Sequence, residues 1–303
     1  MKPPPLDYSR PESLTDALRT LADLGPDGKV LAGGQSLVPL LSMRLAEPMH
    51  LVDINRLADL AYVTRADGQV VVGALARHAE VLASSLVPAA QPLLAKALRF
   101  VAHPAIRNRG TTVGSIVHAD PAAEMPAVLA LLGGTVRVLT AGGERLVGAR
   151  DFFLGVLESD VQPGELVTEV RFPVLPAGTG TGFAEVSRRR GDYAVCGVAA
   201  LVGLNDGQQV EHARAAYLSV GPCPRVLDLT EALAGAPAAS DCLPAAAAMA
   251  RELIHPEGDI HATAEYRRHL AGVLTERALL EALAEARDRG SADFGRQPAG
   301  NAP

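Results

Sequence analysis

The stretch around which this chain is organised reads Val30-Leu31-Ala32-Gly33-Gly34-Gln35-Ser36-Leu37. Its first three residues are apolar and predict the end of a short buried strand. The two glycines that follow allow a sharp turn, because glycine has no Cβ and adopts φ values that other residues avoid. Such a turn exposes backbone N–H groups, which can surround a phosphate. An ordinary tight turn explains the same pattern, so the phosphate interpretation depends on a second stretch.

That second stretch runs from Arg107 to Pro126 and reads Arg-Asn-Arg-Gly-Thr-Thr-Val-Gly-Ser-Ile-Val-His-Ala-Asp-Pro-Ala-Ala-Glu-Met-Pro. Residues 110–115 are small and rich in hydroxyl groups, and they predict a loop whose donors suit a pyrophosphate. Asp120 and Glu124 flank Pro121, where we expect a helix to begin. Carboxylates at such a place bind a ribose or cap the helix.

Two separate glycine-containing loops, one of them followed by acidic residues, fit a dinucleotide better than a mononucleotide. Neither loop has the pattern Gly-x-Gly-x-x-Gly, and the chain has no Gly-Lys-Ser/Thr of a P-loop. The sequence therefore argues against a Rossmann domain and against an ATPase.

Composition excludes several classes of protein. The 303 residues are 48% hydrophobic and 20% charged, which predicts a globular chain with two or three sub-domains. A net charge of −6 argues against nucleic acid or an acidic membrane as partner. No apolar run reaches the ~20 residues of a membrane span, and the N-terminus lacks the apolar core of a secretion signal. Three widely spaced cysteines (Cys196, Cys223 and Cys242) argue against an iron–sulfur or zinc site and predict free thiols in the cytoplasm.

Local patterns divide the chain into four segments. Residues 1–55 form a small α/β lobe, with a helix between the N-cap Ser13 and Gly25 and strands near 30–32 and 51–54. Residues 56–176 form a second lobe, which mixes helices near 77–85 and 122–132 with strands near 69–76, 135–140, 144–147 and 166–172.

The last two segments are a C-terminal domain and a tail. A loop is expected at 175–182, and the domain itself covers residues 177–290. We expect an antiparallel meander of strands near 183–188, 194–204 and 210–220, and helices near 228–234, 244–254 and after Thr263. Residues 291–303 are expected to form a flexible tail.

Three motifs together resemble a known family, the FAD-binding medium subunit of the molybdenum hydroxylases. They are Leu31–Leu37, Ile106–Thr111 and Ala119–Glu124. The family includes carbon monoxide, nicotine, caffeine and xanthine dehydrogenases, and the likeness extends from Met1 to about Leu280. The resemblance implies an α+β fold: a two-lobed FAD-binding domain of the vanillyl-alcohol-oxidase (PCMH) type, then a C-terminal α+β domain with an antiparallel sheet and helices.

The resemblance also implies a role for individual residues. The first loop would wrap the FAD pyrophosphate, through Val30, Leu31, Ala32, Gly33, Gly34, Gln35, Ser36 and Leu37. The second loop would complete this cradle and hold the ribose or adenine side, through Thr111, Gly114, Ser115, Asp120 and Glu124. Val101 and Leu166 would line the flavin and Tyr193 would cover its ring, although core packing explains these three residues equally well. One departure is Val113, which stands where the family has the first of two adjacent glycines, so that its Cβ would shift the loop away from the phosphate.

The function implied is that of an electron-transfer flavoprotein, an oxidoreductase subunit with non-covalent FAD. A large partner subunit would carry the molybdenum cofactor and a small one two [2Fe-2S] clusters, which pass electrons to FAD and on to an external acceptor. The complex would be a cytoplasmic dimer of heterotrimers. We expect neither a catalytic acid/base set nor a metal site in this chain, and His78, His103 and His118 are expected at the surface or in caps. The alternatives are a stand-alone FAD-dependent oxidase of the same fold, and a nucleotide-free scaffold that joins two subunits.

Overall fold

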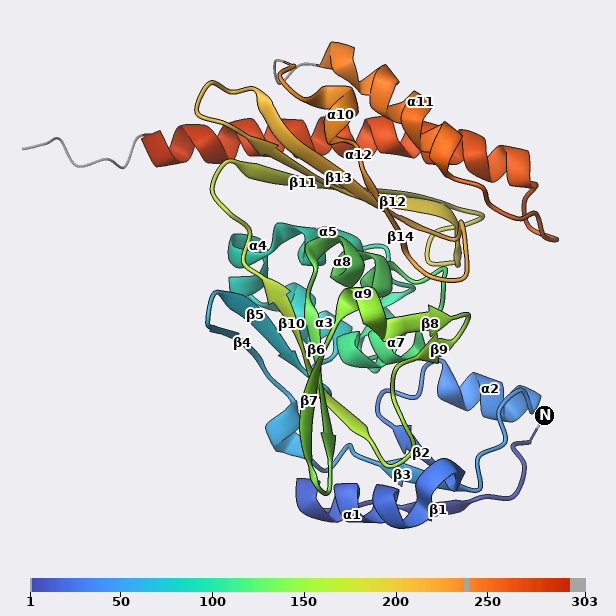
Figure 1. Ribbon diagram of the computed structural model, residues 1–303. Coiled ribbons are helices and arrows are strands. Elements are labelled where there is room, and N and C mark those ends of the chain that lie inside the picture. Colours follow the sequence, from blue (N-terminus) through green and yellow to red (C-terminus); the bar gives the residue numbers. More distant parts are fainter. Residues whose placement is uncertain (1, 237–239, 295–303) are drawn as a thin grey trace, which may run out of the picture. The chain divides into compact units, whose positions relative to one another are not determined.

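The computed structural model describes residues 2–236 and 240–294 of the chain. The chain folds into two compact units, Met1–Val174 and Leu175–Pro303. Sheets of three, five and two strands belong to the first unit, and a four-stranded sheet belongs to the second (Figure 1). Each unit also has its own buried apolar residues.

The first unit begins with a small parallel sheet. Its strand order is β1-β3-β2, with β1 at Asp7–Ser9, β2 at Gly28–Leu31 and β3 at His50–Asp53. Helix α1 (Leu14–Leu24) begins and ends as predicted: the Ser13 hydroxyl accepts the Asp16 N–H, and Gly25 ends the helix with a φ of +55°. A turn at residues 32–36 joins β2 to helix α2 (Leu37–Met43).

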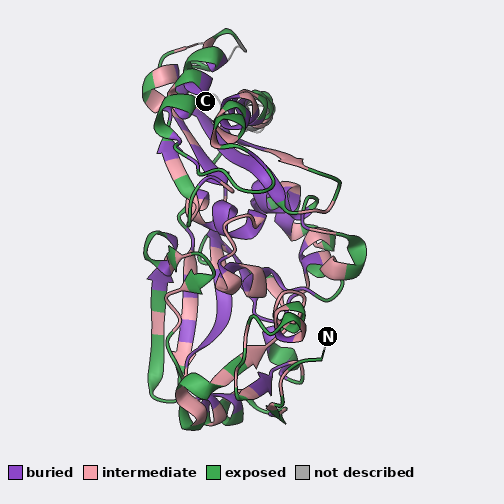
Figure 2. Ribbon diagram, turned by 90° about the vertical axis from the view of Figure 1, so that its right-hand side faces the viewer, coloured by how far each residue is buried: buried purple, intermediate pink, exposed green. Residues whose placement is uncertain are grey.

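A five-stranded antiparallel sheet forms the rest of the first unit's framework. The strand order is β4-β5-β10-β6-β7, with bounds Val63–Ala66, Gln69–Gly73, Leu166–Pro173, Thr135–Thr140 and Gly143–Gly148. The valine run in β5 is buried, as is most of β10, whereas the edge strands β4 and β7 are largely exposed (Figure 2). The two central strands therefore anchor this sheet in the core.

Short helices surround this sheet in the first unit. They are α3 (His78–Ala83), α4 (Leu86–Ala90), α5 (Pro92–Leu98), α6 (Pro104–Arg107), α7 (Thr112–His118), α8 (Glu124–Leu132) and α9 (Ala149–Phe152), with the small hairpin β8 (Phe153–Gly155) and β9 (Glu158–Ser159). Two short 3₁₀ turns lie at Gly25–Asp27 and Ala58–Leu60.

Helix α7 corrects one prediction, because residues 112–115 were expected in a loop and instead form its first turn. Thr111 is the N-cap, and its hydroxyl accepts the Gly114 N–H at 3.0 Å. The hydroxyl-rich sequence was therefore a helix start, since threonine favours N-caps as much as loops.

The second unit is a four-stranded antiparallel sheet covered by helices. The strand order is β11-β12-β13-β14, with bounds Thr179–Ser187, Ala194–Leu204, Val210–Leu218 and Arg225–Asp228. Its helices are α10 (Thr230–Leu233), α11 (Leu243–Leu253) and α12 (Ala264–Phe294), after a 3₁₀ turn at Ser240–Cys242. Helix α12 packs along β11 and β12, and α11 packs on α12 (Figure 1). Among the described residues, no helix is long and apolar enough to cross a membrane.

Strand β11 corrects a second prediction, because the expected loop at 175–182 already contains its first four residues. Glycine here serves close packing: a Cβ on Gly182 would lie 1.9 Å from the Ala278 carbonyl oxygen of α12. Helix α12 also reaches Phe294, so residues 291–294 of the expected tail are helical. The remainder of that tail lies outside the described residues.

Candidate functional site

The two glycine-containing segments lie in direct contact. A Cβ on Gly33 would lie 2.5 Å from the Arg109 carbonyl oxygen and 2.7 Å from the Gly110 Cα. On the other side, a Cβ on Gly110 would lie 3.5 Å from the Gln35 Cγ. Only glycine at position 33 permits this approach, because any side chain would overlap the neighbouring backbone.

The first loop presents a row of free backbone donors. The carbonyls of both glycines are occupied: Gly33 accepts the Gln35 side-chain amide at 2.9 Å, and Gly34 accepts the Val38 N–H at 3.0 Å. By contrast, the N–H groups of Gly33, Gly34, Gln35 and Ser36 have no acceptor within the described part of the chain. Successive free N–H groups form a concavity that suits an anion, and the left-handed φ of +71° at Gly34 belongs to such a geometry.

The second loop is formed by the start of α7. Thr111 and Thr112 are buried, and the Ser115 N–H donates to the Thr111 carbonyl at 3.1 Å. A Cβ on Gly114 would lie 2.5 Å from the Thr111 hydroxyl oxygen, so glycine is required for this cap. Val113 is only 2% exposed, so its side chain is packed in the interior of the unit.

A short segment, residues 76–78, runs antiparallel to the second loop and holds it. The His78 N–H donates to the Gly110 carbonyl at 2.9 Å, and the Thr112 N–H donates to the Ala76 carbonyl at 3.3 Å. The His78 ring, which was expected at the surface or in a cap, is buried, with its Nδ1 3.1 Å from the Thr112 hydroxyl. Burial, assisted by the charge of Arg107, lowers the pKa of His78 to about 4, so the ring is neutral at pH 7.

Two polar side chains that sequence reasoning missed connect both loops. Asn55 donates to the Ala32 carbonyl at 2.9 Å, and Arg77 donates to the Arg109 carbonyl at 2.7 Å. The Arg77 guanidinium also donates to the Asn55 side-chain oxygen at 2.6 Å. A signal for Asn55 existed, because a polar residue just after a strand parallel to β2 lies at the same sheet edge as the first loop. Arg77 had no local signal.

The two predicted carboxylates lie between α7 and α8. Asp120 accepts the Ala122 N–H at 2.8 Å and therefore caps the turn that leads to α8. Glu124 is the first residue of α8, and it is buried although acidic. Burial, and to a smaller extent the charge of Asp120, raises the pKa of Glu124 to about 7.

The remaining predicted residues differ in their surroundings. Val101 and Leu166 are buried apolar residues of the first unit, and the Val101 carbonyl accepts from Arg107 at 2.7 Å. Tyr193 lies in the connection between β11 and β12 of the second unit and is 70% exposed.

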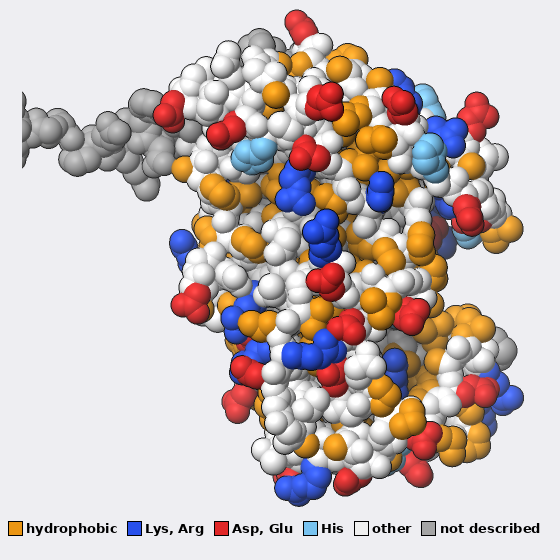
Figure 3. Space-filling view, in the orientation of Figure 1, with side chains coloured by type: hydrophobic (Ala, Val, Ile, Leu, Met, Phe, Trp, Pro, Cys, Tyr) orange, Lys and Arg blue, Asp and Glu red, His pale blue; other side chains and the backbone are white. Residues whose placement is uncertain are grey.

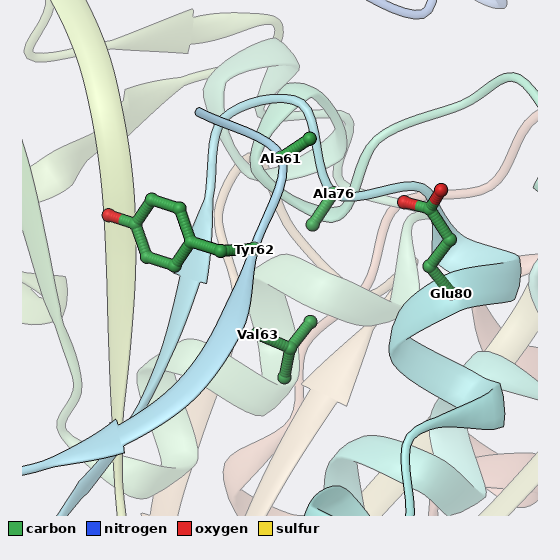
Figure 4. A pocket seen from close by; sticks show the side chains of 5 residues that line it. All are labelled: Ala61, Tyr62, Val63, Ala76 and Glu80. Carbon is green, nitrogen blue, oxygen red and sulfur yellow. The ribbon is translucent and has the colours of Figure 1, made fainter. Parts of the chain in front are cut away.

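A pocket of about 250 Å³ lies beside the segment that holds the second loop (Figure 4). Ala61, Tyr62, Val63, Ala76 and Glu80 line it. The Tyr62 hydroxyl donates to Glu169 of β10, and Glu80 accepts the Arg77 backbone N–H at 2.8 Å. Both polar side chains of this pocket therefore already have structural partners.

Comparison with known proteins identifies the class of protein. Residues 4–175 match the family described as the FAD binding domain in molybdopterin dehydrogenase. Residues 181–282 match the CO dehydrogenase flavoprotein C-terminal domain. With these two domains in this order, the chain is an FAD-binding oxidoreductase subunit.

Individual relatives are similar to this chain over nearly its whole length. The 6-hydroxypseudooxynicotine dehydrogenase complex subunit alpha of Paenarthrobacter nicotinovorans is 42% identical, over 95% of this chain and 97% of the relative. Quinoline 2-oxidoreductase from Pseudomonas putida 86 superposes with a TM-score of 0.89 at 36% identity, over 94% of this chain and 99% of that one. A second solved structure is carbon monoxide dehydrogenase from Hydrogenophaga pseudoflava, in a form that lacks the Mo-pyranopterin moiety of its molybdenum cofactor. It superposes with a TM-score of 0.88 at 36% identity, over 94% of this chain and 99% of that one. The chain belongs to the family of FAD-binding subunits of the molybdenum hydroxylases, and the expected α+β fold is confirmed.

Proposed function

We propose that the chain is the FAD-carrying electron-transfer subunit of a cytoplasmic molybdenum-containing hydroxylase or dehydrogenase. It receives electrons from two [2Fe-2S] clusters on a small partner and passes them to an external acceptor. A large partner carries the molybdenum cofactor and oxidises the substrate, and the complex is a dimer of heterotrimers. The observation that carries this proposal is the contact between the two loops at Gly33 and Gly110. Bound FAD supplies the redox chemistry, and the protein supplies its position and electrostatic surroundings.

The two loops fit a diphosphate by their donors. The N–H groups of residues 33–36 are free to donate to phosphate oxygens, and Thr111, Gly114 and Ser115 lie on the adjoining segment. Val30, Leu31 and Leu37 fix the two ends of the first loop in β2 and α2. We therefore assign both loops to the FAD diphosphate.

Glu124 fits the ribose or adenine side of FAD. Glu124 is 8% exposed, and burial raises the pKa of its carboxyl. A carboxyl group can bond a ribose hydroxyl, and Asp120 is close enough for its charge to raise this pKa further.

The flavin ring requires an apolar environment, which we assign in the first unit to Val101 and Leu166. Both residues contribute buried aliphatic surface there. Tyr193 presents a largely exposed aromatic ring on the second unit. An aromatic side chain at this exposure suits stacking on a planar group.

Partner subunits are supported by the relatives and by the surface. One relative is named as subunit alpha of a dehydrogenase complex. In this chain, Met43, Leu45 and Met49 are 46%, 71% and 64% exposed at the end of α2 and just after it. Hydrophobic side chains gather over this part of the surface (Figure 3). Large exposed apolar side chains in one place are typical of protein–protein contacts.

Purification of the chain with its partner subunits tests the proposal. We expect the denatured complex to release FAD, which a nucleotide-free scaffold would not do. An oxidase would instead show turnover of a small alcohol or amine by the isolated chain. That result would contradict the electron-transfer role.

A glycine pair separates FAD binding from a purely structural role. Gly33→Ala places a Cβ against the Arg109 carbonyl, whereas a Cβ on Gly148 meets no atom within 4 Å. We expect the Gly33→Ala complex to assemble without flavin and the Gly148→Ala complex to retain it. Full flavin content in both variants would show that the first loop does not hold the diphosphate.

A further inference from the structure

Arg77 contacts the segment before the second loop directly and reaches the first loop through Asn55. One guanidinium nitrogen donates to the Arg109 carbonyl at 2.7 Å, and the other donates to the Asn55 side-chain oxygen at 2.6 Å. The Arg109 carbonyl is also the atom that faces Gly33 most closely. Arg77 therefore fixes the Arg109 carbonyl, the backbone group that packs against Gly33.

Asn55 transmits this contact to the first loop. Its side-chain amide donates to the Ala32 carbonyl at 2.9 Å, directly before the glycine pair. Since the amide nitrogen faces Ala32 and the oxygen faces Arg77, both ends of the side chain are fixed. The path from the second loop to the first is thus Arg109, Arg77, Asn55 and Ala32.

Asp53 anchors the path to the parallel sheet. It ends β3, and its carboxylate accepts the Asn55 backbone N–H at 2.9 Å and the Tyr8 hydroxyl at 2.5 Å. Burial alone would raise the pKa of Asp53, but the hydrogen bonds from Tyr8 and Asn55 lower it overall. Asp53 is therefore ionised at neutral pH, and its carboxylate fixes the backbone of Asn55.

We infer that Asn55 and Arg77 are positioning residues for FAD: they hold the two glycine loops at the spacing that the diphosphate requires, without contacting it. This inference rests on the proposed assignment of both loops to the diphosphate. It follows from the contacts, because hydrogen bonds run without a break from the Arg109 carbonyl through Arg77 and Asn55 to the Ala32 carbonyl. Loss of either side chain would break this path and leave the two loops to pack on each other at Gly33 and Gly110.

The test measures FAD and ADP affinity of the full-length chain by calorimetry, because ADP contains the diphosphate and lacks the flavin. We expect Arg77→Met and Asn55→Ala each to weaken both ligands by about tenfold, as loss of hydrogen bonds of this kind implies. The two residues act in one path, so the loss of either one already breaks it. We therefore expect the double variant to bind FAD and ADP as tightly as the single variant with the lower affinity. Full affinity in Arg77→Met would overturn the inference while leaving the proposed function intact.

Arg77→Lys separates positioning from a direct charge contact. Lysine keeps the charge, but it cannot reproduce the planar fork that reaches two acceptors. We expect Arg77→Lys to bind within about threefold of Arg77→Met. Affinity equal to that of the unmodified chain would show that Arg77 acts as a charge on the phosphate, and it would overturn positioning.

A matched control accounts for loss of stability. Arg137 lies in β6 of the same unit and pairs with Glu144, away from both loops. Arg137→Met should leave FAD and ADP affinity unchanged, and the melting temperatures of both ligand-free variants show how much stability each substitution costs. If Arg137→Met and Asn55→Ala lost the same affinity for FAD and ADP, Asn55 would only stabilise the fold and would not position the loops. Failure of the unmodified chain to bind either ligand would instead refute the proposed function.

Discussion

Val113 was expected to displace the second loop, and the structure shows where its side chain lies. It is 2% exposed within α7, so the side chain contributes to the core of the first unit. The sequence alone predicted a displaced loop, because it could not show on which side of the backbone the Cβ projects. The burial explains how valine is accommodated in this helix.

Val113→Gly is therefore expected to destabilise the protein without improving its affinity for FAD. Removal of a buried valine side chain and introduction of glycine into a helix together cost about 3 kcal/mol. Chemical denaturation of the ligand-free chain measures the stability, and fluorescence titration measures FAD affinity. Tighter FAD binding in Val113→Gly would show that the Cβ does obstruct the diphosphate.

Glu124 predicts a pH dependence with a definite sign. Its pKa in the folded chain is about 7, above the ordinary value of 4.5, so the folded state holds a proton that the unfolded state has released. This proton makes the free energy of unfolding fall as pH rises from 4.5 to 7, by about 1.4 kcal/mol per pH unit at most. In Glu124→Gln this contribution disappears.

The measurement is a urea titration of the ligand-free chain at several pH values between 4.5 and 7. The difference in stability between Glu124→Gln and the unmodified chain should grow in favour of the variant as pH rises. A difference that stays constant with pH would show that Glu124 titrates normally in the folded chain.

At the scale of single elements, strand β11 and helix α12 show how an edge strand is protected. Strand β11 is at the edge of its sheet, and Glu285 of α12 accepts both the Thr181 backbone N–H at 2.9 Å and the Thr181 hydroxyl at 2.7 Å. Glu281 accepts the Phe183 N–H at 3.1 Å in the same way. The helix thus occupies donors that would otherwise be open to another strand.

Glu285→Ala is expected to lower the stability of the protein by about 2 kcal/mol, because it leaves backbone and hydroxyl donors of β11 without this acceptor. Differential scanning calorimetry measures the effect. Glu252→Ala, at an exposed site on α11, serves as the control and should change stability by less than about 0.5 kcal/mol. Similar melting temperatures for the two variants would contradict a protective role for Glu285.

At the scale of the whole molecule, both proposed diphosphate loops belong to the first unit, whereas the second unit has a separate buried cluster. Leu279 of α12 is fully buried in that cluster, and its neighbour Leu280 is 51% exposed. The chain therefore offers a way to destabilise the second unit through a residue that belongs to neither loop.

Leu279→Ala should lower stability by about 3 kcal/mol, as large-to-small substitutions in a core do, and Leu280→Ala should have little effect. At a temperature where both variants remain folded, ADP affinity is expected to equal that of the unmodified chain. A weaker affinity for ADP in Leu279→Ala alone would show that the second unit contributes to the diphosphate site.

Features with local signals could be predicted from the sequence. Ser13 and Gly25 delimit α1, the valine run marks β5, and the glycine motifs carry the family resemblance, because each of these signals resides in a few consecutive residues. The start of α7 and the start of β11 were misinterpreted, since threonine and glycine serve caps and close packing as well as loops. The contact between the two loops, and the hydrogen bonds by which Asn55 and Arg77 join them, became visible only in the folded chain. Contacts between residues far apart in the chain leave no periodicity or spacing in the sequence, because they exist only once the backbone has folded.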